Sequence, residues 1–371
     1  MSAQVNLALL IGHFPPAAYG GAELQAEGWA RRLARRHRVT VITRGDARRP
    51  PGREARDGFT VLRTPVSSLP GWRTLADLGA IGRAIDSLAP RPDLLLCFQT
   101  FISGLAGTRI GRRLGIPAVV WIRGETEYRL ADSAFHRWLS PRVWSDAAGV
   151  LVQSDANRDA LMAEMGREAL ARAADVGAKL VVVGNGLELP PVTPLPEAMR
   201  VLCVGRLIAD KGVDVVIDAC ARERLPLTVA GDGPERAALE QRARASGVDA
   251  RFTGHMERTA LDPLYREASV VVLAARRGEG LPNVLLEAMA HARAVIATPC
   301  AGTRDLLADH VNGLSVPPGD AAALASALAA LRADRALATR LGAVARTTAE
   351  AHEWSRVEPR LEAALERWRR R

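Results

Sequence analysis

The stretch of sequence that decides the fold is RRGEGLPNVLLEAMA, residues 276–290. It follows an apolar run at 269–274 that predicts a buried strand, and it leads through two glycines and a proline into a helical pattern. Pro282 suits the first turn of a helix, where its missing N–H group costs nothing. A glycine loop that leads from a strand to a helix N-terminus is typical of a phosphate-binding site.

The same stretch carries two carboxylates, Glu279 on the loop and Glu287 in the early turns of the helix. Carboxylate oxygens beside such a loop can accept hydrogen bonds from sugar or ribose hydroxyl groups. The alternative interpretation is an ordinary strand–loop–helix turn with two solvated glutamates. The motifs in the rest of the chain are needed to choose between a ligand-binding loop and an ordinary turn.

Length and charge narrow the class of protein. A chain of 371 residues exceeds the size of one hydrophobic core, so two domains are expected. The net charge is +9, with the excess in the first half, and this favours an anionic membrane surface or acceptor as a partner. Aromatic residues make up only 4 % of the chain and are not interleaved with basic runs, which argues against nucleic acid.

Several absences in the sequence predict a cytoplasmic protein. No apolar run approaches the length of a membrane span, and the N-terminal segment lacks the basic and apolar regions of a signal peptide. The cysteines are far apart and show neither a disulfide framework nor zinc spacing, which is typical of a reduced cytoplasm. They are Cys97, Cys203, Cys220 and Cys300.

The first half alternates strands and helices, which predicts a doubly wound parallel sheet. The first strand, residues 5–11, leads into a loop with Gly20 and Gly21, and a helix follows to about Arg36. Four arginines of this helix are expected on one face, either solvated or against a membrane: Arg31, Arg32, Arg35 and Arg36. Further strands are predicted at 39–43, 59–62, 94–98, 118–122, 150–152 and 181–183. Candidates for the ligand cleft follow strand ends: Gln99, Arg123, Glu125 and Glu127.

A proline-rich segment at 189–196 reads as an interdomain linker, and the strand–helix pattern then begins again. Arg206 lies just past the strand at 201–205, and Lys211 opens the next helix. Two cations near a helix N-terminus can hold a diphosphate, and a lysine is notable in a chain that uses arginine almost everywhere. The alternative is that Arg206 and Lys211 are two surface cations that bind no ligand.

These motifs together resemble the retaining family 4 glycosyltransferases of GT-B fold. Val204-Gly205-Arg206-Leu207 with Lys211-Gly212 is similar to the family's phosphate motif, and Ala230–Pro234 to its G-x-G-P turn. Glu279 and Glu287 match its E-x7-E motif. Asn185-Gly186 and Gly20–Glu23 match its remaining marks, so the resemblance covers nearly the whole chain.

The resemblance implies two Rossmann-like α/β domains that face each other across a cleft. The N-terminal, acceptor-side domain would comprise residues 1–190, the nucleotide-sugar-binding domain residues 191–353, and a final helix at 354–371 would cross back. Arg206 and Lys211 would hold the diphosphate, Glu279 the hydroxyls of the transferred sugar, and Glu287 those of the ribose. The donor-binding set would be Gly20, Gly21, Gly205, Gly254, His255, Gly280, Leu281, Asn283 and Glu287.

The sequence departs from the family at two places. Many relatives carry a histidine where Arg123 stands, and a guanidinium cannot act as a general base. Arg123 is therefore expected to act electrostatically, on the donor sugar, a phosphate or an acidic acceptor, unless it faces away. A Gly-Gly-x-x-Glu turn of the family reads Ala301-Gly302-Thr303-Arg304-Asp305 here, which leaves the sugar contacts of that turn open.

The sequence thus predicts a cytoplasmic, retaining glycosyltransferase that moves a sugar from a UDP- or GDP-sugar to a saccharide or lipid-linked acceptor. A role in bacterial surface glycan synthesis and contact with the inner face of the membrane are part of this expectation. No Asp-x-Asp occurs, so neither a metal nor another cofactor is expected. The alternatives are a GT-B sugar phosphorylase and a non-catalytic nucleotide-sugar-binding protein. A NAD-dependent oxidoreductase fits less well, because no Gly-x-Gly-x-x-Gly follows the first strand.

Overall fold

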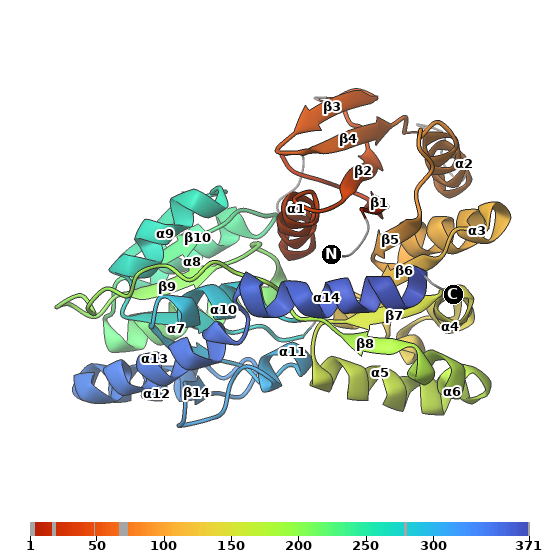
Figure 1. The fold of residues 1–371 in the computed structure, drawn as a ribbon. Coiled ribbons are helices and arrows are strands. Elements are labelled where there is room, and N and C mark those ends of the chain that lie inside the picture. Colours follow the sequence, from red (N-terminus) through yellow and green to blue (C-terminus); the bar gives the residue numbers. More distant parts are fainter. Residues whose placement is uncertain (1–3, 17–19, 48, 67–72, 278–279, 370–371) are drawn as a thin grey trace. The chain divides into compact units, whose positions relative to one another are not determined.

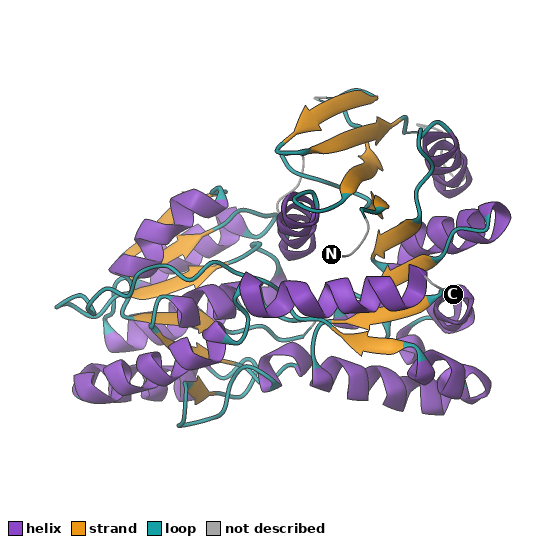
Figure 2. Ribbon diagram, viewed as in Figure 1, coloured by secondary structure: helices purple, strands orange, loops and turns teal. Residues whose placement is uncertain are grey.

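The computed structural model describes residues 4–16, 20–47, 49–66, 73–277 and 280–369, and the chain divides into two compact units. Unit 1 comprises Met1–Gly186 with Val357–Arg371, and unit 2 comprises Leu187–Arg356. The division falls a few residues before the boundary that the proline-rich segment predicted. Each unit is an α/β domain built on its own sheet (Figures 1 and 2).

The sheet of unit 1 has the strand order β3-β4-β2-β1-β5-β6-β7-β8. Its described pairings are parallel except for that of β3 with β4. The order reverses between β1 and β5, so the carboxyl ends of these strands flank the switch point of a doubly wound sheet. The strands are β1 Asn6–Leu10, β2 Arg38–Arg44, β3 Gly52–Arg56, β4 Phe59–Thr64, β5 Leu94–Phe98, β6 Ala118–Trp121, β7 Gly149–Val152 and β8 Leu180–Val182.

Helices cover both faces of this sheet, and β5, β6 and β7 are buried throughout, as apolar parallel strands should be. The helical elements of unit 1 are α1 Gly21–Leu33, α2 Arg73–Asp86, η1 Thr100–Gly104, α3 Leu105–Leu114, η2 Glu125–Glu127, η3 Leu130–Asp132, α4 Ala134–Asp146, α5 Asp155–Glu168 and α6 Leu170–Ala178. Ser154 caps α5, because its side-chain oxygen accepts a hydrogen bond from the N–H of Asn157.

Two details of unit 1 differ from the sequence prediction. Helix α1 ends at Leu33, so Arg35 and Arg36 lie beyond it and the expected four-arginine helical face is wrong. The strand β3 was not predicted. Its sequence, GREAR, shows no alternation of apolar and polar residues, and nearly all of its side chains are exposed. It is an edge strand held by backbone pairing to β4, which side-chain patterning does not report.

The sheet of unit 2 has the strand order β11-β10-β9-β12-β13-β14, with all described pairings parallel. Numbered within the unit this is 3-2-1-4-5-6, the order of the dinucleotide-binding Rossmann sheet, with its switch point between β9 and β12. The strands are β9 Val201–Val204, β10 Leu227–Ala230, β11 Ala250–Gly254, β12 Val270–Leu273, β13 Ala294–Ala297 and β14 Leu314–Ser315.

Apolar clusters lie on both faces of the unit 2 sheet. The helical elements that cover them are η4 Ala209–Lys211, α7 Val213–Glu223, α8 Arg236–Ser246, α9 Arg258–Glu267, α10 Asn283–Ala290, α11 Ala301–Arg304, α12 Ala321–Ala333 and α13 Arg335–Glu350. The predicted central helix is α10, and it begins directly after Pro282.

The last helix, α14 Trp354–Arg369, starts in unit 2 and continues in unit 1. At its start, Leu187 hydrogen-bonds with the backbone of His352 and Trp354, which fixes the entry of the helix in unit 2. Near its end, Trp368 is fully buried, and its ring fills the space that a Cβ atom at Gly149 on β7 would need. The chain thus returns to unit 1 through a helix anchored by packing at each end.

The four cysteines are buried and not bonded to one another. Within the described ranges, no helix combines the length and apolarity needed to cross a membrane.

Candidate functional site

The first candidate site lies at the carboxyl edge of the unit 2 sheet, at the switch point between β9 and β12. These strands are parallel neighbours, so the loops that follow them leave the same edge. The β9 loop holds Gly205, exposed Arg206 and half-buried Lys211 at the end of the η4 turn. The β12 loop holds buried Gly280 and Leu281 and leads to Asn283, the first residue of α10. Glu279 lies outside the described residues.

The two loops are joined by Arg276. Its backbone N–H donates to the carbonyl of Asp210 at 2.7 Å, and its Nη1 donates to the carbonyl of Ala209 at 2.7 Å. Its guanidinium also forms two hydrogen bonds of 2.9 and 2.7 Å with the carboxylate of Asp214 on α7. Partial burial alone would raise the pKa of Asp214, but the hydrogen bonds and charge of Arg276 lower it. The turn that carries Lys211 is therefore held against the loop that leads to α10.

Close backbone contacts explain the glycines of the predicted motifs. A Cβ atom at Gly231 would overlap the carbonyl of Gly205, and φ is +147° there. A Cβ atom at Gly302 would overlap the carbonyl of Gly280. Glycines 231 and 302 therefore allow neighbouring loops to approach the switch point without a side chain between them.

The N-terminus of α10 points its first turn toward this edge. Its N-cap is Pro282, and no described side chain caps the helix by a hydrogen bond. A helix N-terminus with two cations on the adjoining loop favours the binding of an anion. The arrangement can bind a phosphate or diphosphate group.

Glu287 lies one helical turn into α10, and protein groups hold both of its oxygens. Tyr265 donates its hydroxyl to Oε2 at 2.8 Å, and Nε of Arg258 lies 3.2 Å from Oε1. Burial, and then the charge of Glu287, raise the pKa of Tyr265 well above its ordinary value, so the phenol remains a donor. The carboxylate is 13 % exposed and keeps lone pairs for a ligand hydroxyl.

His291 supports this arrangement from the end of α10. Its ring stacks on Tyr265 with centroids 5.0 Å apart, and its Nε2 and Nδ1 each lie 2.8 Å from an acceptor. These acceptors are the carboxylate of Asp262 for Nε2 and the carbonyl of Glu287 for Nδ1. Tyr265 is thereby fixed before any ligand arrives.

Gly254 and His255 end β11 at the same edge of the sheet. The carbonyl of Gly254 accepts a hydrogen bond from the N–H of Gly231 at 2.9 Å, and φ of Gly254 is +75°. The side chain of His255 is exposed. This places both residues beside the β10 turn, two strands away from the switch point.

The second candidate site is the carboxyl edge of the unit 1 sheet. Gly20 is the N-cap of α1, and Glu23 of the first turn folds back over it. The side-chain amide of Gln25 pairs with the backbone of Gly186, at 2.9 and 3.0 Å. The Gly20-Gly21 turn is therefore tied to the Asn185-Gly186 motif at the opposite end of unit 1 in sequence.

Arg123 follows β6 at this edge and is only 8 % exposed. Its guanidinium carbon lies 4.9 Å from the ring centroid of Trp121 and 5.6 Å from that of Phe98. Nη2 donates to Oδ1 of Asn185 at 2.8 Å. Burial lowers the pKa of Arg123 to about 10, against the opposing charges of Glu127 and Glu23, so the side chain stays cationic at neutral pH.

Glu127 organises the loops around Arg123. Its two oxygens accept the backbone N–H groups of Arg123 and Thr100 at 2.7 and 2.6 Å, which joins the loops after β5 and β6. Burial raises the pKa of Glu127, and these hydrogen bonds oppose the rise. Gln99, between β5 and this contact, has φ of +76°, a strained conformation of the kind found at ligand sites.

The predicted residues thus fall into two groups. Gly205, Arg206, Lys211, Gly280, Leu281 and Asn283 come together at the switch point of unit 2, with Glu287, Gly254 and His255 on flanking elements. Gly20, Gly21 and Arg123 belong to the edge of unit 1. Sequence reasoning missed Arg276, Asp214, Tyr265 and Arg258, because ion pairs between residues distant in sequence have no local pattern. Within the described ranges, no group of three His, Cys, Asp or Glu side chains could hold a metal ion.

Two family models match the chain, one on each unit. Residues 20–186 match the glycosyl transferase 4-like domain, and residues 198–334 match glycosyl transferases group 1. Each unit of the chain therefore matches a glycosyltransferase domain family. The chain belongs to the family 4-type glycosyltransferases of group 1.

Curated relatives include the alpha-D-kanosaminyltransferase of Streptomyces kanamyceticus, 30 % identical over 62 % of this chain and 65 % of that protein. The lipopolysaccharide core biosynthesis glycosyltransferase LpsE of Rhizobium meliloti is 37 % identical over 39 % of this chain. That match covers 43 % of LpsE, so both alignments span less than two thirds of the relative's length.

Solved structures match the whole fold. Sucrose-phosphate synthase from Thermosynechococcus elongatus has a TM-score of 0.85 at 21 % identity, over 98 % of this chain and 99 % of that one. Anabaena HepE in complex with UDP and glucose has a TM-score of 0.80 at 18 % identity, over 98 % of this chain and all of that one. These neighbours are GT-B glycosyltransferases, and the predicted GT-B fold is confirmed.

Proposed function

We propose that the chain is a retaining, metal-independent glycosyltransferase that moves a sugar from a UDP- or GDP-sugar to a saccharide or lipid-linked acceptor. Synthesis of a bacterial surface glycan is the proposed setting, in line with the lipopolysaccharide role in the name of the Rhizobium relative. UDP is favoured as the nucleotide because the HepE structure contains it.

One observation carries the proposal: Arg206 and Lys211 share the switch point of the unit 2 sheet with the N-terminus of α10. A nucleotide sugar leaves a diphosphate whose negative charge grows as the bond to the sugar breaks. Two fixed cations and a helix N-terminus stabilise that charge in the transition state more than in the ground state. The brace through Arg276 keeps the groups in place before the donor binds, which lowers the reorganisation cost.

The proposed reaction breaks the bond between the anomeric carbon and the diphosphate oxygen. The acceptor hydroxyl oxygen forms the new bond to the same carbon from the same face, and its proton passes to the departing phosphate oxygen. No protein base is needed in this sequence, which accords with an arginine at position 123. Glu287 would accept the ribose hydroxyls, and Glu279 would accept those of the transferred sugar.

The two cations also motivate the proposal that no metal is required, because they supply the positive charge that a divalent ion would supply. The small number of lysines argues against a sugar phosphorylase, which would need a lysine to bind its cofactor. Besides Lys211 the chain has only Lys179, whose Nζ is 3.1 Å from Asp175 and donates to the carbonyl of Ser145. Lys179 therefore has a structural role in unit 1.

Nucleotide binding tests the proposal. Melting temperatures would be measured with UDP, GDP, ADP and NAD for the wild type, Lys211→Ala and, as a control, Arg340→Ala on the exposed side of α13. A ligand that binds only the folded chain raises its melting temperature. UDP or GDP should stabilise the wild type and the control but not Lys211→Ala. A shift with NAD alone would contradict the proposal.

Donor hydrolysis separates an enzyme from a non-catalytic binder. A catalytically competent site should slowly release UDP or GDP from a matching nucleotide sugar in the absence of acceptor. A proton NMR spectrum recorded early in the reaction should show that the freed sugar has the same anomeric configuration as it had in the donor. Addition of EDTA should leave the rate unchanged. Tight nucleotide binding without any turnover across a donor panel would favour the binder.

We also propose that unit 1 contacts an anionic membrane surface, which would place a cytoplasmic enzyme at the inner face of the membrane. Helix α4 exposes Phe135 and Trp138, 58 % and 52 % accessible, and Arg142 lies 4.9 Å from the Trp138 ring. Aromatic and basic side chains together on one helix are typical of an interfacial contact.

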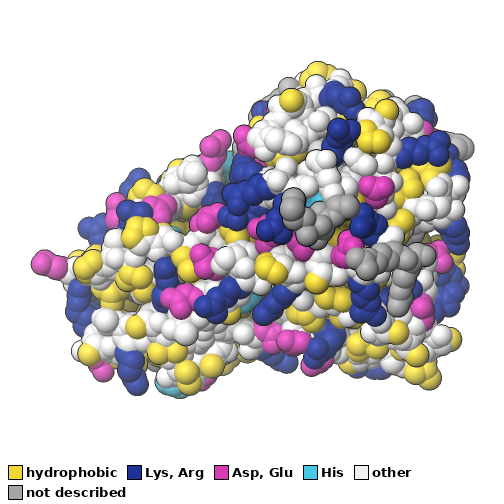
Figure 3. Space-filling model, in the orientation of Figure 1, with side chains coloured by type: hydrophobic (Ala, Val, Ile, Leu, Met, Phe, Trp, Pro, Cys, Tyr) yellow, Lys and Arg dark blue, Asp and Glu magenta, His cyan; other side chains and the backbone are white. Residues whose placement is uncertain are grey.

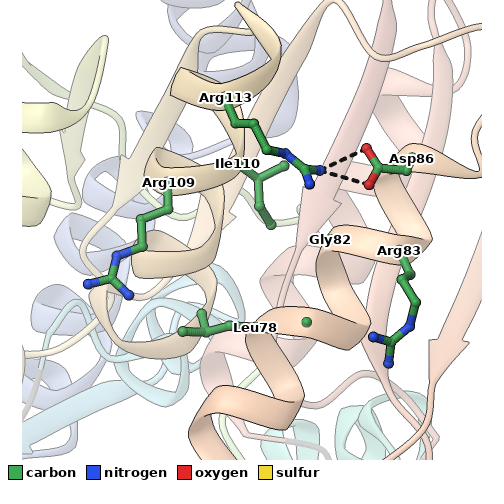
Figure 4. Close-up of a pocket in the computed structure, with 8 residues that line it drawn as sticks. Leu78, Gly82, Arg83, Asp86, Arg109, Ile110 and Arg113 are labelled. Atoms are coloured by element: carbon green, nitrogen blue, oxygen red, sulfur yellow. Dashed lines mark hydrogen bonds and ion pairs between the residues drawn. The ribbon is translucent and has the colours of Figure 1, made fainter.

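The neighbouring helices α2 and α3 add arginines to this region. Figure 4 shows Arg83 and Arg109 on either side of Leu78 in a cavity of about 370 Å³, with Arg113 bound to Asp86. On the face shown in Figure 3, basic and acidic side chains are interspersed, so a local aromatic anchor matters more than an overall field.

Vesicle binding tests this contact. The wild type should bind vesicles that contain phosphatidylglycerol more tightly than pure phosphatidylcholine vesicles, and salt should weaken the binding. A Phe135→Ser/Trp138→Ser variant should lose it, whereas Val311→Ser, at an exposed apolar position of unit 2, should keep it. Equal binding by both variants would remove α4 from the contact.

A further inference from the structure

The guanidinium of Arg123 is a buried cation that the described protein only partly satisfies. Of its three nitrogens, Nη2 donates to Asn185, but Nε and Nη1 are buried and have no hydrogen-bond partner among the described residues. A buried donor without a partner costs about 1–3 kcal/mol, and more when it is charged. Such a group persists in a fold only when other contacts or a function retain it.

No described carboxylate forms an ion pair with Arg123. Glu127 lies four residues after Arg123, but its two oxygens accept the backbone N–H groups of Arg123 and Thr100 instead. Glu23 acts on the guanidinium only through its charge. The nearby carboxylates therefore favour the charged form of Arg123, but none of the described carboxylates pairs with its guanidinium.

The surrounding contacts orient the guanidinium. Asn185 accepts from both Arg123 and Gln153, the latter at 2.9 Å, so its amide orientation is fixed. The rings of Trp121 and Phe98 lie beside the cation, and Trp29 of α1 packs on Trp121 at 5.5 Å. Residues after β6, β7 and β8 therefore build one rigid cradle at the edge of the sheet where ligands bind.

We infer that Arg123 is a specificity residue that recognises an anionic group, a carboxylate or a phosphate, on the acceptor substrate. The inference rests on the proposed function, in which unit 1 receives the acceptor. Nη2 has a second N–H group, which forms a two-donor edge with either Nε or Nη1, and such an edge matches the two oxygens of a carboxylate or phosphate. The aromatic walls exclude water and strengthen that interaction.

Charge matching favours the acceptor over the donor. The diphosphate of a nucleotide sugar carries one negative charge on each phosphate, and Arg206 and Lys211 in unit 2 match these charges. The sugar that is transferred from UDP-glucose or a similar donor is neutral. A third cation, Arg123, is buried in the other unit and is therefore left for a charge on the second substrate.

The test compares matched neutral and anionic probes on the full chain with UDP at saturation, so that the diphosphate site is filled. D-glucuronate, D-glucose and inorganic phosphate would be added at constant ionic strength, with melting temperature and titration calorimetry as readouts. The variants are Arg123→Met, Arg123→Gln and, as a control, Arg91→Met, an exposed arginine that precedes β5.

Glucuronate or phosphate should stabilise the wild type and Arg91→Met, whereas glucose should not, and both Arg123 variants should lose the response. A glucuronate response would identify a carboxylate-bearing sugar, and a phosphate response a phosphorylated acceptor. Without anion, Arg123→Met should melt a few degrees above the wild type, because a buried, incompletely paired cation is removed.

An unchanged anion response in the Arg123 variants would overturn the inference. Lower melting temperatures of both variants without anion would also overturn it, because Arg123 would then be a structural residue. If UDP does not bind the wild type, the proposed function fails, but the anion series without UDP still reports on Arg123.

Discussion

The two sheet edges treat their positive charges differently. At the edge of unit 2, Arg276 is paired with Asp214 by two hydrogen bonds, and Arg206 is exposed to solvent. At the edge of unit 1, Arg123 is buried beside two aromatic rings, and two of its nitrogens lack a described partner. Each unit therefore places cations where parallel strands end, but Arg276 of unit 2 has a complete ion pair, whereas Arg123 of unit 1 has none among the described residues.

The two sheet edges illustrate two ways in which a protein can prepare a site for an anion. In unit 2, backbone contacts and the Arg276 brace hold the loops, and the Arg206 side chain is exposed to solvent. In unit 1, the cation is already desolvated, so much of the cost of burial precedes binding. A desolvated cation discriminates more sharply between anionic and neutral ligands, because the neutral ligand leaves it unpaired.

The largest effect is expected from Gly302→Ala, which places a methyl group on the carbonyl of Gly280. The β12 loop would have to move, with a loss of about 3 kcal/mol in unfolding free energy and of nucleotide binding. Gly166→Ala in α5, where nothing lies within 4 Å, should instead stabilise by about 0.5–1 kcal/mol. Urea unfolding and UDP titration would measure both, and a neutral Gly302→Ala would show that the edge is not set by this contact.

Glu127→Gln tests how the edge of unit 1 is held. The amide has one acceptor oxygen, so its NH2 group would face one of the two backbone N–H groups that the carboxylate now satisfies. A loss of about 1–3 kcal/mol in unfolding free energy is expected. If urea unfolding shows no loss, the two loops are held by other contacts and Arg123 does not depend on Glu127 for its position.

Tyr265→Phe tests whether Glu287 is positioned for ribose. Loss of the hydroxyl should reduce the preference for UDP over 2′-deoxy-UDP by about fivefold, the value of one hydrogen bond. Tyr128→Phe is the matched control, because that buried hydroxyl has no described partner and its removal should leave the preference unchanged. Titration calorimetry with both nucleotides gives the ratio directly. Retention of the ratio in Tyr265→Phe would remove the tyrosine from this role.

The smallest effect concerns the brace itself. The pKa of Asp214 is lowered in the folded chain, so its contribution to stability is present above the unfolded pKa of about 3.9 and is lost as the pH falls through the folded value. Asp214→Asn should therefore cost about 0.5–1 kcal/mol at pH 7, because the pair is partly exposed. In urea unfolding, the difference from the wild type should shrink as the pH falls below the unfolded pKa of about 3.9. A difference that is the same at pH 7 and at the lowest pH at which the protein stays folded would show that charge is not its source.

Local patterns in the sequence were enough to predict much of the secondary structure of unit 2 and the positions of its candidate site residues. The run at 270–273 is a buried strand, Pro282 immediately precedes α10, and the cations at 206 and 211 follow β9. Patterns of this kind are local, because burial on both faces requires an unbroken apolar strand and helix starts have their own residue preferences. The edge strand β3 and the early end of α1 lacked such signals and were mispredicted.

The sequence by itself determined that two Rossmann-like domains form and which loops carry the candidate phosphate-binding residues. Only the tertiary structure decided that Arg276 pairs with Asp214, that Tyr265 and Arg258 hold Glu287, and that Arg123 is buried beside Asn185. The reason is physical: strand and helix formation follow from the spacing of apolar residues within one segment. The pairing of side chains depends on the order in which strands assemble, which brings together residues that are distant in the chain.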